Sequence, residues 1–421
     1  MKFTRAACAV AASLASVALV AGCSGSTPGD SAAGADGTGP FTLVIGKDTS
    51  GKLQSKVIDL WNKEHPDAKA KVIELPASAD EQRAAIVQNF QAHSDRFDAI
   101  SADVVWTSEF AARGWIQKID PSGLPIKDML PAAVKTAQYK GDLYGAPITS
   151  AGALLFYRKD LISKPPTTWK DLIDDCRIAK QHNMGCYAGQ FAKYEGLTVN
   201  ATEAINSAGG SVYGSDGSVT VDSPQAKAGL DFLVNGFKQG YIPKSAITYQ
   251  EEDARRAFQQ GKLLFLRNWP YVYSLANAGG SDSVIKGKFG MAPLPGANGV
   301  GSTTLGGNNL VLSSYSKHKK SVEQFMAFME SPAVQRVEVE DLSNSPVLTD
   351  LYTDKKLVAE NPYLPILKEG LLHGAPRPQV PAYDETSLRI QTHVYDALTG
   401  KKDTAAALKE LAADLRKIPA N

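Results

Sequence analysis

The sequence has almost no net charge and no excess of basic residues. Its 421 residues include 45 Lys and Arg against 44 Asp and Glu, so the formal net charge is +1. Proteins that bind nucleic acid usually carry a basic excess, so we expect no nucleic-acid partner. A hydrophobic fraction of 43% excludes the composition of a disordered chain. The length is sufficient for two or more domains, each with its own core.

Long apolar runs are absent except at the N-terminus, and that run is too short for an ordinary membrane span. Residues 1–22 have the pattern of a signal peptide, with Lys2 and Arg5 before a stretch of small apolar residues. The segment ends in Val-Ala-Gly-Cys23, which resembles a bacterial lipobox, where the cysteine carries a lipid. We therefore expect a lipoprotein anchored on the extracellular face of the cell membrane. Plain secretion, with Cys23 incidental, is the alternative.

Residues 23–40 are expected to form the lipidated cysteine and a flexible tether, because they contain no side chain that can anchor a core. Cysteine is scarce in the remaining chain, where only Cys176 and Cys186 are left as an even pair. In an oxidising compartment we expect a disulfide between them, which would add about 2–3 kcal/mol to stability. Two free buried thiols are the alternative.

Metal-binding patterns are also missing. The six histidines form no HxxxH or HExxH motif, and Cys176 and Cys186 form no CxxC motif. We therefore expect no metal site and no cofactor.

Short apolar runs alternate with helical periodicity along the rest of the chain. Strands are expected at 42–45, 70–75 and 97–100, separated by helices that begin near Leu53 and Glu81. This alternation predicts a mostly parallel sheet. The alternation restarts after about residue 150, with helices expected after Thr168 and Ser223, so the prediction is two α/β lobes.

The first strand-to-helix turn imitates a phosphate-binding loop. Residues 46–52 match G-x-x-x-x-G-K, but Leu53 stands where the loop needs Ser or Thr to hold Mg²⁺. We do not expect nucleotide binding. A turn of this kind still presents backbone N–H groups to a cleft, and Asp48 and Thr49 are candidate contacts to a polar ligand.

Seven segments are informative in their order and spacing. They are residues 103–115, 145–148, 154–161, 165–169, 251–262 leading to 268–270, 306–308 and 377–378. Taken together, they resemble the extracellular sugar-binding proteins of ABC importers, the maltose-binding-protein family. The resemblance covers nearly all of residues 41–421 and is greatest to trehalose- and maltose-type lipoproteins of actinobacteria.

The resemblance implies a two-lobed α/β fold of the class II periplasmic-binding-protein type, with a ligand cleft between the lobes. Lobe I would comprise 41–148 plus 304–344, and lobe II 150–303 plus 346–421. A hinge of three crossing segments would join them near Thr149-Ser150, Ser302-Thr303 and Ser345-Pro346. Interdomain clefts are common ligand sites, and hinge closure on a ligand is typical of such proteins.

A sugar needs aromatic rings for its C–H faces and planar charged groups for its hydroxyls. Asp103 and Glu251 are candidate carboxylates by resemblance, although each sits where a helix N-terminus also favours an acidic residue. Trp269 is the expected stacking residue, whereas Trp106 either stacks on the sugar or packs inside the lobe. Glu251 and Glu252 do not form a glycosidase pair, because adjacent helical residues point about 100° apart.

The remaining candidate ligand-binding residues come after the second and third predicted crossing segments in the sequence. Gly306 allows close approach of a ligand to the backbone, and Asn308 either binds the ligand or caps a turn. Arg377 lies between two prolines and suits bidentate recognition, with a surface ion pair as the alternative. Ala151 stands where trehalose-binding relatives carry a sugar-contacting Asn, which puts trehalose itself in question.

The predicted function is therefore non-enzymatic. We expect a substrate-binding lipoprotein that captures a disaccharide or related oligosaccharide, such as a trehalose- or maltose-type α-glucoside, and delivers it to the ABC permease subunits. The alternatives are the same fold with a polyamine, peptide or metal ligand, and a secreted glycoside hydrolase.

Overall fold

The computed structural model describes residues 37–418. The predicted signal peptide, Cys23 and residues 24–36 of the predicted tether lie outside the described residues. Within residues 37–418, no helix has the length and apolar character that a membrane crossing needs.

A six-stranded sheet forms the first lobe, in the order β12-β11-β3-β1-β2 with β6 paired to β11. Its central strands are parallel, whereas β11 runs antiparallel to β3 and β6. The third strand begins two residues later than predicted and includes Asp103 as its last residue. The strands are β1 (Phe41–Ile45), β2 (Ala70–Glu74), β3 (Ala99–Asp103), β6 (Ala146–Ala151), β11 (Thr304–Leu312) and β12 (Ala375–Pro376).

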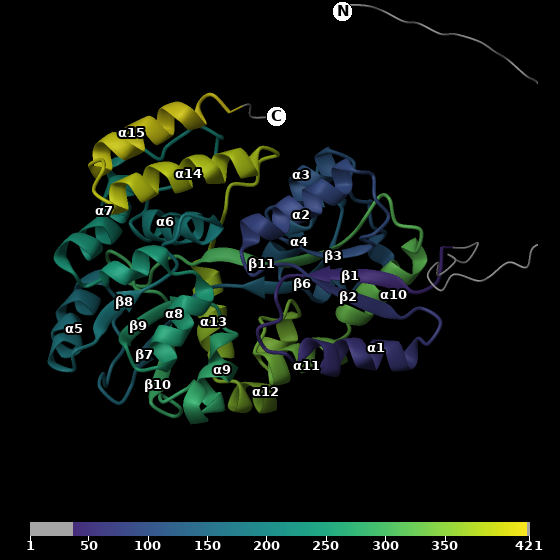
Figure 1. Cartoon of the computed structure of the whole chain (residues 1–421), viewed down its shortest axis with the longest axis horizontal. Helices are drawn as coiled ribbons and strands as arrows, with labels where there is room; N and C mark the ends of the chain where they lie inside the picture. Colours follow the sequence, from purple (N-terminus) through teal and green to yellow (C-terminus); the bar gives the residue numbers. More distant parts are fainter. Residues whose placement is uncertain (1–36, 419–421) are drawn as a thin grey trace, which may run out of the picture. The chain divides into compact units, whose positions relative to one another are not determined.

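Both faces of this sheet are covered, which explains why Leu43, Val44 and Ile45 follow one another in β1. Leu43 and Ile45 pack into a core that contains Trp61, whereas Val44 packs with Phe90 on the opposite face. The covering helices and their neighbours are η1 (Gln54–Ile58), α1 (Asp59–Glu64), α2 (Ala79–Gln91), α3 (Thr107–Ala112), α4 (Pro131–Thr136), α10 (Lys319–Met329) and α11 (Pro332–Leu342) (Figure 1). A small hairpin joins β4 (Gln138–Tyr139) to β5 (Asp142–Leu143).

The second sheet has four strands in the order β10-β7-β9-β8. Only β8 and β9 are parallel, so the sheet is mixed and the expectation of a mostly parallel second sheet is wrong. Local patterning cannot assign strand direction here, because β7 and β9 are about a hundred residues apart and meet only in the tertiary fold. The strands are β7 (Leu154–Arg158), β8 (Gly185–Ala188), β9 (Leu263–Asn268) and β10 (Phe289–Ala292).

Four helices of the second lobe, α6, α7, α14 and α15, pack mainly against one another, whereas α5 and α8 pack on strands of the sheet. Figure 1 shows α14 and α15 together beside α6 and α7, in agreement with their contacts. The helices of this lobe are α5 (Trp169–Gln181), α6 (Glu195–Ser207), α7 (Pro224–Gln239), α8 (Glu251–Gln259), α9 (Val272–Ala278), α12 (Lys355–Glu360), α13 (Tyr363–Leu372), α14 (Tyr383–Leu398) and α15 (Thr404–Leu415). Short turns complete the chain at η2 (Pro121–Gly123), η3 (Ile126–Asp128), η4 (Lys244–Thr248), η5 (Gly280–Asp282) and η6 (Thr349–Tyr352).

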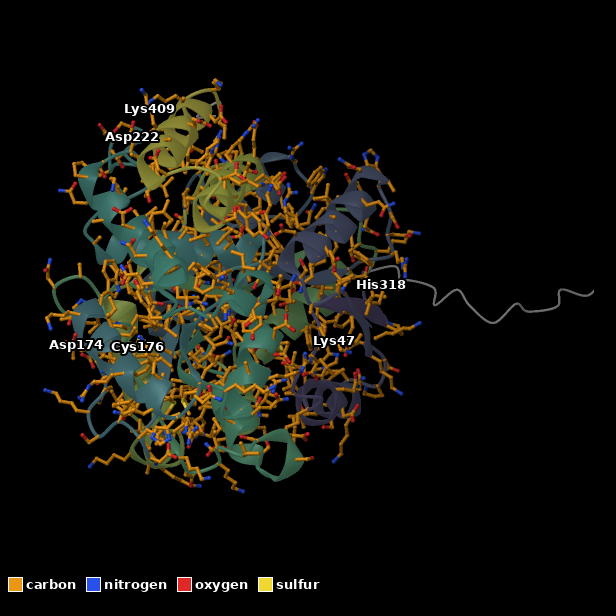
Figure 2. All side chains as sticks on the ribbon, turned by 60° about the vertical axis from the view of Figure 1, so that its left-hand side comes forward. Lys47, Asp174, Cys176, Asp222, His318 and Lys409 are labelled. Atoms are coloured by element: carbon orange, nitrogen blue, oxygen red, sulfur yellow. A yellow bond between two sulfur atoms is a disulfide. The ribbon has the colours of Figure 1, made fainter. Side chains whose placement is uncertain are left out.

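Local signals at several helix ends are confirmed. Thr168 and Asp171 form a reciprocal capping box at the start of α5. Ser223 caps α7, and Gly240 ends it in the left-handed conformation with φ 81°. A disulfide links Cys176 on α5 to Cys186 on β8, and Figure 2 labels the first of these residues.

The three predicted crossing segments lie beside one another. The Ser150 N–H donates to the Ser345 carbonyl at 3.1 Å, and the Ala153 N–H donates to Thr303 Oγ1 at 2.6 Å. These contacts bring together residues far apart in the sequence. The exact lobe boundaries stay a prediction.

Glu330, at the C-terminal end of α10, is a buried carboxyl group that no sequence pattern predicted. It is fully buried, and neither carboxyl oxygen has a hydrogen-bond partner in the described chain. Burial raises the pKa of Glu330 to about 9. The group is therefore neutral in the folded protein at pH 7 but ionised in the unfolded chain.

We expect Glu330→Gln to stabilise the protein by about 3 kcal/mol at pH 7. A raised folded pKa means that the native state holds the extra proton, so wild-type stability falls as pH rises from about 4.5 to 9. Urea unfolding across this pH range measures the effect, with the exposed Glu323→Gln on the same helix as control. Parallel stability-versus-pH curves for wild type and Glu330→Gln would contradict this account.

Candidate functional site

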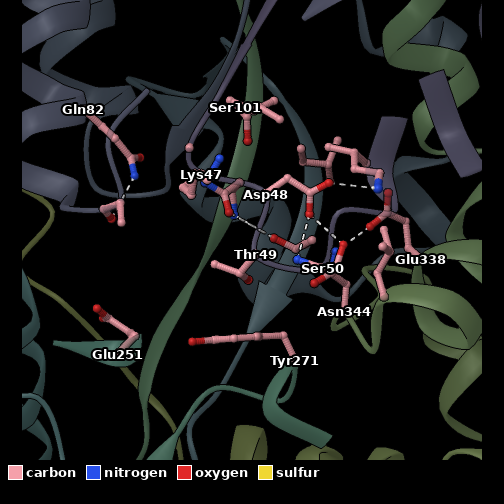
Figure 3. Close-up of a pocket in the computed structure, with 18 of the residues that line it drawn as sticks. Lys47, Asp48, Thr49, Ser50, Gln82, Ser101, Glu251, Tyr271, Glu338 and Asn344 are labelled. Carbon is pink, nitrogen blue, oxygen red and sulfur yellow. Dashed lines mark hydrogen bonds between the residues drawn. The ribbon is translucent and has the colours of Figure 1, made fainter. Parts of the chain in front are cut away.

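Two adjoining cavities lie where the two sheets approach each other. The larger measures about 810 Å³, within the size range of small-molecule sites, and the smaller adds about 290 Å³. Figure 3 shows the larger cavity, with residues 47–50 on one side and Glu251 and Tyr271 on the other. The residues that line both cavities are Ala77, Thr149, Glu251, Tyr271, Asn308 and Asn344.

Most of the predicted site residues come together at these cavities. The larger one receives Asp48 and Thr49, from the turn after β1. The smaller one is lined by Asp103, Ala151, Trp269, Gly306 and Arg377. Only Trp106 lines neither cavity: it is 3% exposed and packs in the core with its ring 6.1 Å from that of Phe110. Of the two alternatives for Trp106, the structure favours packing.

Trp269 is half-buried, and a buried ion pair lies against one face of its indole ring. The guanidinium of Arg267 lies 4.3 Å from the centre of the indole ring. Arg267 is itself 1% exposed and forms two hydrogen bonds of 2.6 and 2.7 Å to Glu203. A cation on one face of an indole is a favourable contact. The arrangement holds the ring as part of the cavity wall.

Asn268 and Gly306 complete the support of Trp269. The Asn268 side chain accepts from the Trp269 N–H at 2.8 Å and donates to the Glu251 carbonyl at 3.0 Å. A Cβ atom at Gly306 would lie 3.1 Å from the indole ring. A side chain at Gly306 would therefore crowd the indole of Trp269, whereas close approach of a ligand to this glycine stays a prediction.

Arg377 is the centre of a buried ion cluster rather than a free ligand-binding group. It is 3% exposed and makes hydrogen bonds of 2.6 and 3.1 Å to Asp103. A third hydrogen bond, of 2.8 Å, reaches Glu195 at the start of α6. The predicted bidentate geometry exists, but its partner is a carboxylate of the protein. The alternative of a surface ion pair is wrong because the pair is buried.

The buried carboxyl group of Glu195 is stabilised by the contacts of this cluster. Burial raises the pKa of Glu195, and the positive charge of Arg377 opposes that shift. Its oxygens also accept hydrogen bonds from the hydroxyls of Tyr383 and Ser387. The Asp80 side chain accepts from the Glu195 N–H at 3.0 Å, which connects the starts of α2 and α6.

Glu251 and Glu252 point to different partners. Glu251 accepts from the Tyr194 hydroxyl at 2.6 Å and lines both cavities. Glu252 instead bonds Arg255 and the Tyr271 hydroxyl, at 2.8 Å for the latter. The divergence agrees with the expectation that these carboxylates do not act as a catalytic pair.

The turn at 46–52 uses its own carboxylate where a phosphate loop would hold an anion. The Asp48 side chain accepts from the backbone N–H groups of Ser50, Gly51 and Leu53 at 3.0–3.1 Å. It also accepts from the Ser50 hydroxyl. These bonds occupy the backbone N–H groups that a phosphate would need. Of the two predicted ligand contacts, Asp48 and Thr49, only Asp48 is engaged in these bonds.

Asn308 lies in strand β11 rather than in a turn, so its suggested role as a turn cap is wrong. It is paired with Asp103 on one side and Thr149 on the other. Its N–H donates to Thr149 Oγ1 at 2.9 Å. Ala151 presents only a methyl group nearby, whereas Thr149, on the same face of β6, supplies a hydroxyl to both cavities.

Residues 46–336 match the family model described as bacterial extracellular solute-binding protein. The chain belongs to this family. A probable ABC transporter-binding protein of Deinococcus radiodurans is 30% identical over 382 residues, which are 86% of this chain and 89% of the relative. A maltotriose-binding protein of Pyrococcus abyssi is 25% identical over 74% of this chain and 68% of its own length.

Solved structures agree with this assignment. The T. maritima protein MalE3, determined with bound maltose, has a TM-score of 0.85 at 32% identity and covers 90% of this chain and 99% of its own. The relatives are substrate-binding proteins and not enzymes. The predicted two-lobed α/β fold is confirmed, as is membership among the binding proteins of ABC transporters.

Several residues of this solute-binding protein at the cavities were not predicted from the sequence. They are Tyr194 and Glu195 at the start of α6, Tyr271, Glu338 and Asn344. The Tyr194-Glu195 pair precedes a helix that is buried on nearly every side, so no amphipathic pattern marked it. Tyr271 follows the Asn268-Trp269-Pro270 motif closely, and that proximity was the one available signal. In residues 37–418, no cluster of three or more His, Cys, Asp or Glu side chains has the arrangement of a metal site.

We expect Arg377→Met to destabilise the protein by about 3–5 kcal/mol, because it leaves Glu195 buried without its cation. Adding Glu195→Gln to this variant should restore part of the loss. Urea unfolding of the two variants measures the difference, with Arg389→Met at an exposed position of α14 as control. A loss for Arg377→Met no larger than that of the control would contradict the buried cluster.

Proposed function

We propose that this solute-binding protein captures a disaccharide or related oligosaccharide, of the maltose or trehalose α-glucoside type, and delivers it to the permease subunits of an ABC importer. The observation that carries the proposal is Trp269: a half-buried indole in the cavity wall, with Glu251 and Asp103 close to the same space. This combination suits the apolar face and the hydroxyl edge of a sugar ring.

The relatives support a sugar ligand. The proteins of T. maritima and P. abyssi are described with maltose and maltotriose respectively. A relative in Bacillus subtilis, 25% identical over 64% of this chain, is a maltodextrin-binding protein. Because Ala151 provides no hydrogen-bonding group, the proposal favours a maltose-type ligand over trehalose.

Binding would proceed by closure of the two lobes about the crossing segments, with the ligand between Trp269 and the opposite wall. The closed form would then dock on the permease. A lipid on Cys23 and the tether of residues 23–40 would keep the protein at the extracellular face of the membrane, close to that partner. A cationic polyamine is less well served than a neutral sugar, because Arg377 already neutralises the charge of Asp103.

The test is calorimetric titration of the soluble chain 24–421 with maltose, maltotriose, trehalose, cellobiose and glucose. We expect saturable micromolar binding of at least one α-glucoside, with no hydrolysis product by chromatography. Trp269→Ala should weaken that binding more than tenfold, which corresponds to more than about 1.4 kcal/mol.

The matched control is Trp169→Ala, which removes an indole stacked on Phe232 outside both cavities. Thermal melting checks that both variants are folded. If wild type binds no sugar in the panel, the sugar proposal is wrong. If a folded Trp269→Ala binds as tightly as wild type, the stacking site lies elsewhere.

A further inference from the structure

Glu203, on the buried helix α6, lines neither cavity, yet it is bonded to two parts of the site. It is 5% exposed, and its two oxygens accept from the guanidinium of Arg267 at 2.6 and 2.7 Å. The oxygen that takes the shorter of these bonds also accepts from the Thr304 N–H at 3.0 Å. One carboxylate thus joins the cation beside Trp269 to the first residue of β11, directly after the second predicted crossing.

The second predicted crossing is held to α6 by further contacts around this carboxylate. The Thr303 hydroxyl donates to Glu203 at 3.5 Å and accepts from the Ala153 N–H at 2.6 Å. The Thr304 hydroxyl lies 3.1 Å from that of Thr202, the residue before Glu203. All five residues are buried. One turn of α6 is therefore fixed to the segment at which the two lobes are joined.

Arg267 connects this turn of α6 to the indole ring. Its guanidinium lies 4.3 Å from the ring centre of Trp269, and its remaining bond goes to the Gln190 side chain at 2.7 Å. Gln190 in turn donates to the Arg267 carbonyl at 3.1 Å. Because Glu203 and Gln190 bind the planar guanidinium from different elements, they fix its orientation beside the ring.

We propose that Glu203 is a positioning residue for ligand binding, which immobilises the indole of Trp269 through Arg267 and fixes it relative to the second crossing through Thr304. The inference rests on the proposed function, because it takes Trp269 as the surface on which a sugar ring stacks. A ring that is ordered before the ligand arrives avoids the ordering cost of binding. Buried ion pairs add little net stability compared with apolar residues of similar size, so geometry is the contribution we expect from this pair.

The first test variant combines Glu203→Gln with Arg267→Met, so that no lone charge is left buried. Gln keeps an acceptor for the Thr304 N–H, whereas Met removes the cation beside the indole. By calorimetry we expect the affinity for the sugar that wild type binds most tightly among maltose, maltotriose and trehalose to fall about fivefold. In a Trp269→Ala background the same two substitutions should change affinity by less than about twofold, because the indole through which they act is gone.

The matched control combines Arg158→Met with Asp160→Asn. This pair also has two hydrogen bonds, of 2.6 and 2.8 Å, and lines neither cavity. It should leave affinity within about twofold of wild type, and thermal melting checks that every variant is folded. Wild-type affinity in the folded first variant, or an equal loss in the Trp269→Ala background, would overturn the role through the indole.

The second test variant combines Glu203→Leu with Arg267→Met and also removes the acceptor of the Thr304 N–H. We expect it to bind about threefold more weakly than the first variant. This additional loss should persist in the Trp269→Ala background, because the crossing loses its bond to α6 whether or not the indole is present. Equal affinities of the two variants would overturn the link to the crossing.

Fluorine spectra of protein labelled with 5-fluorotryptophan test the indole without any ligand. The chain has five Trp residues, and Trp269→Phe identifies the signal of Trp269. In the first variant we expect the transverse relaxation rate of this signal, and of no other, to change as the ring gains mobility. An unchanged rate would overturn the positioning role. If wild type binds none of the three sugars, the proposed function is rejected, and the fluorine spectra still decide whether Glu203 immobilises the ring.

Discussion

The buried cluster of Arg377, Asp103 and Glu195 is the interaction on which the site depends. It joins the end of β3, the start of α6 and the loop after β12, three parts of the chain separated by about a hundred residues or more. Because Arg377 and Glu195 are buried and Asp103 is only partly exposed, the cluster is favourable only while all of its partners are in place. The smaller cavity is consequently built around a rigid set of charges, and its free hydrogen-bonding capacity comes from neighbouring residues such as Glu251 and Thr149.

Trp269 is likewise a cavity residue that contacts with several other residues hold in place. Its position is set by Asn268 at its N–H, by Arg267 beneath the ring and by the absence of a side chain at Gly306. Arg267 is in turn held by Glu203 on α6. The helix that supplies Glu195 to one charge cluster thus supplies Glu203 to the other, and a rigid support of this kind reduces the ordering that binding would otherwise require.

Three carboxyl groups, one partly buried and two buried, differ in how their oxygens are satisfied. Asp48 is satisfied by backbone donors, Glu338 is half satisfied, and Glu330 has no partner in the described chain. The three differ in environment rather than in chemical type. Asp48 takes its partners from the next five residues, whereas the burial of Glu330 and Glu338 is set by tertiary packing.

Local patterning determined the elements that rest on neighbouring residues. The alternation of apolar runs and helical spacing, the Thr168 cap and the Gly240 stop were all readable from the sequence, because a strand face, a cap or a left-handed turn needs only residues within a few positions. The ordered motifs also indicated the family and most cavity residues. Only the tertiary structure decided that Arg377 faces Asp103 and Glu195, that Trp106 is core, that the second sheet is mixed and that Glu338 lines the cavity. Those outcomes depend on which distant segments meet, and burial and charge pairing between distant segments leave no periodic trace in a single sequence.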